Sequence, residues 1–274
     1  MTILLPLWAD YYFAALIFLL GACLGSFANV CIYRMPRGGS VVTPRSHCPH
    51  CRQTIAWYDN IPLCSFLGLR ARCRHCRGQI AFQYFLVELL LAALFLVIWL
   101  KFRFDPRTPI YWLMATALVI GAFIDFEFMI LPDRLTIGGM LLGPILSALA
   151  PALQGQPSAY LGFCVSVGAL VLGSLALWLV ATLGTLAFRK EAMGMGDVKL
   201  LGALGAFLGW KAVFFIIVGA SLSGALVGVM LVLTQHKTMA SKIPFGPYLA
   251  LAALVWIMGG SDWWGAYTAW CSGS

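Results

Sequence analysis

Charged residues are scarce in this chain. Only 10% of its 274 residues are Asp, Glu, Lys or Arg, whereas an ordinary soluble domain contains about 25%. Hydrophobic residues make up 61% of the chain. This balance excludes an ordinary soluble protein and indicates a polytopic membrane protein.

Negatively charged residues are scarcer than positively charged ones, with 10 Asp and Glu against 18 Lys and Arg. The net charge of +8 does not indicate a nucleic-acid partner. Basic stretches interleaved with aromatic residues, as single-strand binding requires, are missing. Lys and Arg also collect in the cytoplasmic loops of membrane proteins, which accounts for the excess.

A basic segment ahead of the first apolar run is missing too. Secretory signal peptides begin with such a segment, but the first ten residues contain no Lys or Arg. The run 11–32 is long enough to cross a bilayer, which takes about 20 apolar residues. We therefore expect a retained first membrane span.

Apolar runs recur along the chain and predict an all-α polytopic membrane protein. Lipid offers no partner for free backbone groups, so spans must be helical. The sixth run is short and interrupted by glycines. About eight transmembrane helices are expected, at 11–32, 81–100, 110–126, 135–152, 159–188, 198–210, 212–234 and 245–261.

The distribution of Lys and Arg predicts the orientation. With the amino terminus outside, 14 of the 18 basic residues lie on the inner side, and Lys101, Arg103, Arg107 and Lys211 lie outside. Such a bias marks the cytoplasmic side. The same orientation brings Asp125, Asp133 and Asp197 to the cytoplasmic ends of their helices.

A polar loop at 34–80 carries two C-x-x-C pairs, Cys48 with Cys51 and Cys73 with Cys76. This spacing is typical of a four-cysteine zinc site, and four protein ligands make the site structural. Two disulfides or a redox pair are the alternatives, and a reducing cytoplasm disfavours disulfides. The expected organisation is a first transmembrane helix at 1–33, the zinc-binding loop at 34–80 and a transmembrane domain at 81–274.

Two acids stand at the edges of apolar runs, where Asp is rare and usually functional. Asp125 closes the third run, and Asp197 follows Gly194 and Gly196 at the start of the sixth. Paired carboxylates that share a proton perform aspartic proteolysis. The glycines permit close approach of a second backbone.

Other acids have plainer explanations. Asp133 follows Pro132, where capping and the helix dipole favour an acid, and Asp197 itself fits a helix cap. Glu88 lies well inside the second run and needs a partner or a proton. We expect Asp133 and Glu88 to be accessory.

A series of motifs then resembles the type IV prepilin peptidases, bacterial inner-membrane aspartic proteases of the Gly-x-Gly-Asp class. The similarity covers nearly the whole chain. Its segments are Gly25–Val30, Arg34–Pro36, the two C-x-x-C pairs, Trp57–Leu63, Leu86–Glu88, Ile124–Asp125, Leu131–Thr136, Gly194–Leu200 and Ile243–Tyr248.

The resemblance implies that Asp125 and Asp197 are the catalytic pair. It implies removal of a short basic leader from prepilins or pseudopilins of type IV pili or type II secretion, after a Gly, at the cytoplasmic membrane face. Many members then methylate the new amino terminus with S-adenosylmethionine. The zinc loop belongs to these bifunctional members.

The sequence departs from the family pattern in two places, and the second departure bears on methylation. Gln83-Tyr84-Phe85 stands where the family usually has Arg-Tyr-Pro. Ala71 stands where the family usually has Gly before the second cysteine pair. No glycine-rich nucleotide fingerprint marks a cofactor site, so the sequence leaves the residues that bind S-adenosylmethionine open.

Two alternatives remain at this point. The chain could be a peptidase without methyltransferase activity. It could also be a zinc-stapled proton or ion transporter whose acids form a proton path. The absence of a visible inverted repeat disfavours the transporter. Prepilins and membrane lipid are the expected partners, and the sequence does not give an oligomeric state.

Overall fold

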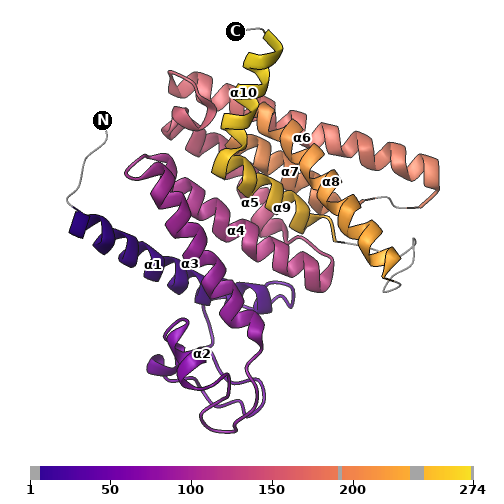
Figure 1. Cartoon of the computed structure of the whole chain (residues 1–274). Coiled ribbons are helices and arrows are strands. Elements are labelled where there is room, and N and C mark those ends of the chain that lie inside the picture. Colours follow the sequence, from indigo (N-terminus) through magenta and orange to yellow (C-terminus); the bar gives the residue numbers. More distant parts are fainter. Residues whose placement is uncertain (1–6, 191–192, 235–243, 273–274) are drawn as a thin grey trace. The chain divides into compact units, whose positions relative to one another are not determined.

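The computed structural model describes residues 7–190, 193–234 and 244–272, and within these ranges the chain is helical, with no strand (Figure 1). This confirms the all-α fold class. Contacts divide the chain into two compact units, residues 1–120 and 121–274. The predicted boundaries at 33/34 and 80/81 stay predictions.

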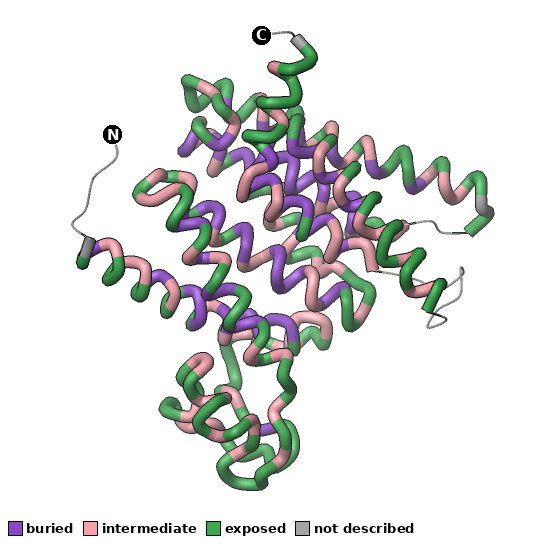
Figure 2. Tube along the Cα trace, viewed as in Figure 1, coloured by how far each residue is buried: buried purple, intermediate pink, exposed green. Residues whose placement is uncertain are grey.

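The helix α3 buries one face in the first unit, where it packs against α1. Within α3, Val87, Leu91, Phe95 and Ile98 are fully buried. Their spacing of four, four and three places them on one face of the helix. Figure 2 shows this burial along α3, whereas the loop beyond it is largely exposed. The elements of this unit are α1 (Leu7–Arg34), a 3-10 turn (Trp57–Asn60), α2 (Cys64–Gly68), α3 (Phe82–Phe102) and the first part of α4 (Arg107–Phe128).

Glycines let α1 approach α3 closely. A Cβ at Gly21 would lie 2.8 Å from the Cα of Ala92, and one at Gly25 would lie 2.5 Å from the Cα of Glu88. Small residues four positions apart are a common means of packing helices in membranes. The contact holds Glu88 against α1.

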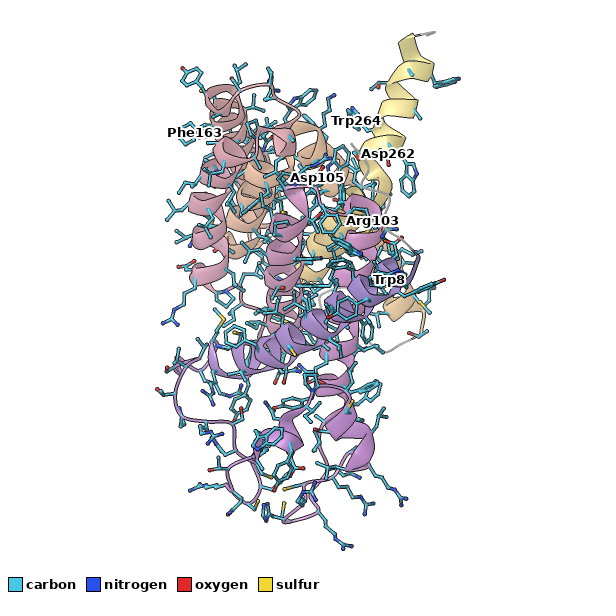
Figure 3. All side chains as sticks on the ribbon, turned by 90° about the vertical axis from the view of Figure 1, so that its left-hand side faces the viewer. Trp8, Arg103, Asp105, Phe163, Asp262 and Trp264 are labelled. Atoms are coloured by element: carbon cyan, nitrogen blue, oxygen red, sulfur yellow. The ribbon has the colours of Figure 1, made fainter. Side chains whose placement is uncertain are left out.

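The turn after α3 carries paired charges. Arg103 Nη1 lies 3.1 Å from Asp10 Oδ1, and Arg107 Nη2 lies 2.8 Å from Asp105 Oδ2. Figure 3 shows Arg103 and Asp105 in this turn. The hydrogen bond from Arg107 lowers the pKa of Asp105. Together with the exposed Trp8, these groups resemble the belt of polar and aromatic residues at a membrane–water interface.

The second unit is built around α7. Ten of the 14 residues of α7 are buried, and it packs against α5 and α6 (Figures 1 and 2). The elements are the end of α4, α5 (Asp133–Leu149), a 3-10 turn (Pro151–Gln154), α6 (Ala159–Phe188), α7 (Met195–Leu208), α8 (Trp210–Leu233), α9 (Gly246–Val255), a π-helical turn (Trp256–Gly260) and α10 (Ser261–Ser272).

One backbone carbonyl joins α7 to its neighbours. The Ala206 carbonyl accepts hydrogen bonds from the Ser147 hydroxyl at 3.1 Å and the Gln154 amide at 2.7 Å. The Ser166 hydroxyl of α6 donates to the same oxygen. Ser147 and Ser166 are fully buried. Buried polar groups that are satisfied in this way fix helix positions more specifically than apolar contacts do.

A helix occupies each of the eight ranges predicted as spans, but the count of eight is not confirmed. Among the described residues, five helices are long and apolar enough to cross a membrane: α1, α3, α4, α6 and α8. By contrast, α5, α7 and α9 have 17, 14 and 10 residues. A helix rises about 1.5 Å per residue, so these three are shorter than a hydrocarbon layer about 30 Å thick.

Candidate active site and metal centre

Asp125 lies in the last turn of α4 and is 6% exposed. Its Oδ2 accepts a hydrogen bond from the backbone N–H of Gly246 at 2.9 Å. Gly246 is the first residue of α9, where helical N–H groups have no partner within the helix. A Cβ at position 246 would lie 2.8 Å from this same oxygen. A side chain there would collide with the carboxylate.

Asp197 lies in the first turn of α7 and is 9% exposed. Gly194 occupies the N-cap position with no side-chain cap, and the Asp197 carboxylate accepts a hydrogen bond from the Gly194 backbone N–H. Within the described part of the chain, the buried Oδ1 of Asp197 has no hydrogen-bond partner. Leaving a buried acceptor unsatisfied costs about 1–3 kcal/mol. A water molecule or a substrate bound at this site would satisfy it.

The two carboxyl groups are close enough to interact electrostatically. The structure thus brings together the two acids that the sequence proposed as a pair. Gly194 lies beside Asp197, and a Cβ there would be 3.7 Å from Oδ2. A Cβ at Gly196 would be 2.9 Å from the Cβ of Leu131, so this glycine permits a close contact with the segment before α5.

Asp133 is the first residue of α5 and has a partner of its own. Its Oδ1 lies 2.6 Å from Lys199 Nζ, and the two side chains are 63% and 33% exposed. An exposed pair of this kind contributes about 0.2–1 kcal/mol. The pair joins α5 to the first turn of α7, which supports an accessory rather than a reacting role for Asp133.

Sequence reasoning assigned no role to Gly246, although the segment that contains it was part of the family resemblance. The signal was Pro-Phe-Gly-Pro at a helix start, and its meaning depends on a contact across 121 positions. Ile243, the first residue of that segment, lies outside the described residues.

The four predicted metal ligands form one cluster. The sulfur atoms of Cys48, Cys51, Cys73 and Cys76 all lie within 4.8 Å of one another. The Sγ atoms of Cys48 and Cys76 are 3.8 Å apart. Tetrahedral zinc with Zn–S bonds of about 2.3 Å separates its sulfurs by about 3.8 Å. The donor set and its spacing therefore fit a zinc ion.

The two cysteine pairs lie on two separate backbone turns of the same kind. Cys48 N–H donates to the Gln53 carbonyl, and Cys73 N–H donates to the Gly78 carbonyl, both at 2.9 Å. Arg52 and Arg77, which follow the second cysteine of each pair, have φ of 57° and 56°. The loop thus contains one turn used twice, and this repetition brings the four sulfurs together.

Hydrogen bonds within the loop shift the pKa values of the clustered thiols in opposite directions. Backbone N–H groups of Cys76 and His75 lower the pKa of the Cys73 thiol to about 7. The Gly78 N–H lowers the pKa of the Cys76 thiol, but burial and hydrogen bonds with the other three thiols raise it further, to about 11. Arg74 binds Asp59 with its Nη2 2.6 Å from Oδ1, and this contact lowers the pKa of Asp59. The Arg74–Asp59 pair ties the segment between the cysteine pairs to the second turn.

The backbone conformation at Ala71 accounts for the glycine that the family usually has at this position. Its φ is +57°, in the left-handed region, and Arg70 before it has φ of +49°. Ala71 is also hydrogen-bonded on both sides, to the Phe66 carbonyl and from the Ile80 N–H. A non-glycine residue pays about 1–2 kcal/mol for this conformation. The departure from the family pattern therefore strains the backbone without changing the turn.

Glu88 belongs to α3 in the first unit and is 9% exposed. Its Oε2 accepts the backbone N–H of Leu63 at 2.7 Å, and the Ser26 hydroxyl also hydrogen-bonds to it. Leu63 has φ of +61° and ψ of −50°, and Cys64 N–H donates to the Pro62 carbonyl across it. This is a γ-turn of the rare, strained type. Glu88 thus holds a strained turn of the loop against α3.

Comparison with known proteins gives a consistent family. Residues 19–102 match the bacterial peptidase A24 N-terminal domain, and residues 112–229 match the type IV leader peptidase family. The boundary between the compact units, at 120/121, falls near the start of the second match.

Curated relatives extend the similarity over most of the chain. A prepilin leader peptidase/N-methyltransferase of Myxococcus xanthus is 41% identical over 85% of this chain and 67% of its own length. Proteins of the same name from Aeromonas hydrophila and Pseudomonas aeruginosa are 38% and 34% identical, over 90% and 87% of this chain and 91% and 88% of their own lengths. No solved structure matches the chain. With two matching family models and relatives more than 30% identical over most of its length, this multi-pass membrane protein belongs to the type IV leader peptidase family.

Proposed function

We propose that this protein removes the leader peptide of type IV prepilins or pseudopilins and that Asp125 and Asp197 are its catalytic pair. The observation that carries the proposal is the electrostatic interaction between these two acids, each more than nine-tenths buried, within one helical unit. Family membership supports the proposed cleavage of the leader peptide. The positions of the two acids support their assignment as the catalytic pair.

Hydrolysis by such a pair uses one carboxylate and one carboxylic acid. The carboxylate accepts a proton from water as the water oxygen attacks the scissile carbonyl carbon. The carboxylic acid protonates the carbonyl oxygen. The leaving nitrogen then receives a proton from one of the two acids. Gly246 N–H orients the Asp125 carboxylate for this work. The unpartnered Oδ1 of Asp197 leaves an acceptor for the water or the peptide.

The substrate chemistry fits the architecture. A prepilin combines a basic leader with an apolar helix, so the helix can lie in lipid while the leader meets the acids at the membrane edge. We place this edge at the cytoplasmic face of the bacterial inner membrane, as the Lys and Arg distribution indicates.

We further propose that the protein methylates the amino terminus exposed by cleavage, as the names of its relatives indicate for them. S-adenosylmethionine would supply an electrophilic methyl group. The cysteine cluster would hold zinc as a structural ion and keep the loop folded, since four ligands leave no open position. Family membership gives the transporter alternative no support.

The direct test mixes purified protein in detergent with a prepilin and follows the shortened product and its mass. Asp125→Asn and Asp197→Asn should each lower the cleavage rate by about 100-fold or more, the range of general acid–base catalysis. Glu127→Gln, an exposed acid two residues from Asp125, is the matched control and should cleave normally. Unchanged cleavage by either Asp variant would show that the assigned pair is wrong.

Methylation is read in the same experiment. With S-adenosylmethionine added, the mature product should gain the mass of one methyl group. A cleaved product that never gains this mass would mean that the protein is a peptidase without methyltransferase activity.

A further inference from the structure

A cavity of about 400 Å³ lies within residues 1–120, where the cysteine loop meets the end of α1 and the start of α3. Its volume falls within the range of small-molecule and cofactor pockets, about 300–1,000 Å³. Its lining combines residues of all three segments, and those used below are Asn29, Val30, Tyr33, Phe66, Tyr84 and Glu88. The proteolytic site uses none of them.

The lining includes a buried carboxyl group, Glu88, that forms no ion pair with any described residue, although the basic residues Arg34, His47, His50, Arg74 and His75 also line the cavity. Glu88 is more than nine-tenths buried, and both of its hydrogen-bond donors, Leu63 and Ser26, are neutral. Among the residues that the structure describes, no Lys, Arg or His pairs with it. A carboxylate has about four acceptor sites, so two donors leave capacity for a ligand. A buried charge is stabilised by an opposite charge, which favours a cationic ligand.

Aromatic rings line the same cavity. Phe66 stacks on Phe85 with ring centroids 5.2 Å apart, and Tyr33 and Tyr84 also contribute to the wall. Asn29 is fixed by its amide, which donates to the Tyr84 carbonyl at 2.9 Å. Aromatic faces suit both a flat heterocycle and a cation. The cavity therefore offers complementary surfaces to a ligand that has an aromatic base and a positive centre.

We propose that this cavity binds S-adenosylmethionine, with the Glu88 carboxylate next to the sulfonium. The inference rests on the proposed methylation and assigns it a site. The adenine ring matches the aromatic wall, and the positive sulfur matches Glu88. In the reaction the neutral amine of the mature prepilin bonds to the methyl carbon, the sulfur–methyl bond breaks, and its electrons make the sulfur a neutral thioether. The amine then loses a proton to solvent.

This step changes the charge that faces Glu88. The donor is a cation at sulfur, whereas the product, S-adenosylhomocysteine, is neutral there. Glu88 should therefore favour the donor over the product and assist product exchange. A purely structural Glu88, which only holds the Leu63 turn, would make no such distinction.

The test measures binding to the purified full-length chain in detergent by calorimetry, with three probes. S-adenosylmethionine and sinefungin carry a positive centre at the position in question, and S-adenosylhomocysteine does not. Glu88→Gln should weaken the two cationic probes by about tenfold or more, as expected for the loss of one charge-assisted contact. Its affinity for S-adenosylhomocysteine should change by less than about threefold. Glu127→Gln should alter none of the three.

A second variant guards against misfolding of the first. Val30→Trp adds bulk to the cavity wall from α1 and should weaken all three probes together. Retained zinc content and an unchanged thermal transition verify that each variant folds.

The outcomes separate this inference from the proposed function. If the wild type methylates prepilin but Glu88→Gln binds both cationic probes normally, the site assignment is wrong and the function stands. Equal loss of all three probes in a folded Glu88→Gln also overturns the sulfonium contact. If the wild type neither binds S-adenosylmethionine nor methylates, both fail, while cleavage still reports on the peptidase. If only the mature prepilin's amino terminus binds here, the cavity belongs to the methyl acceptor and the proposal is wrong.

Discussion

At the scale of single residues, a backbone N–H orients one of the two proposed catalytic acids. Gly246 donates to Asp125 from the first position of α9, and no side chain could occupy that position without meeting the carboxylate. The orientation of the Asp125 carboxylate therefore depends on the position of α9. It also makes a glycine as important as an acid.

Gly246→Ala should reduce prepilin cleavage strongly. The new Cβ would displace the Asp125 carboxylate, and misplacement of a reacting group by about 1 Å can cost about 100-fold in rate. Gly138→Ala in α5 is the matched control, because a Cβ there meets nothing within 4 Å. Cleavage rates of the two purified variants decide the matter. A Gly246→Ala protein as active as Gly138→Ala would remove the positioning role.

The sequence could predict the acids but not what holds them. Asp125 and Asp197 were identified because carboxylates at the edge of apolar runs are rare, and the Lys and Arg count put them on one side. Gly246 could not be found in this way, because a backbone N–H has no signature in the sequence. Similarly, Glu88 was known to need a partner, but the N–H of a strained turn at Leu63 was not foreseeable.

At the scale of elements, the cysteine loop contains two equivalent turns that meet at the cluster of four cysteine sulfurs. Its own apolar burial is small: of the loop residues, Cys48 is the buried one. A short segment without a core needs a staple to stay folded. The four-cysteine prediction followed from spacing alone, whereas the repetition of the turn required the backbone.

Removal of zinc should therefore unfold the loop. Cys48→Ser, or chelation of the wild type, should lose the metal and raise hydrogen exchange in residues 46–80, since structural zinc contributes folding energy. Peptides from α6 serve as the internal reference. Metal analysis and exchange mass spectrometry give the two readings. Full zinc and full protection in Cys48→Ser would contradict the structural role.

The same measurement tests the strain at Ala71. Ala71→Gly should slow exchange in the loop, because glycine adopts the left-handed φ of +57° without steric conflict. Ala81→Gly is a suitable control, because Ala81 has φ of −58°. Faster exchange in Ala71→Gly than in the wild type would mean that the alanine is not strained.

At the scale of the whole molecule, five helices among the described residues have the length and composition of membrane spans, and eight were predicted. The count of eight is not confirmed, because α5, α7 and α9 are shorter than these five helices, and apolar content alone does not give the length of a helix. Fold class was nevertheless predictable, because hydrophobic content this high leaves few alternatives to a helical bundle in lipid.

Topology can be tested with a membrane-impermeant maleimide. After zinc chelation, the loop cysteines should be labelled in inverted membrane vesicles and not in right-side-out vesicles, since the Lys and Arg bias places residues 34–80 in the cytoplasm. Asp105→Cys, in the turn after α3, should show the opposite pattern. Mass spectrometry of labelled peptides separates these sites from the other cysteines. Loop labelling from the outside would reverse the orientation.

The burial of α7 has a consequence for how the protein is made. Ten of its 14 residues contact other parts of the second unit rather than lipid, and it is too short to span on its own. The position of α7 therefore depends on its packing against α5 and α6 more than on partitioning into lipid. Asp197 then reaches Asp125 only when the bundle has closed, so the nascent chain cannot cut anything until its own assembly is finished.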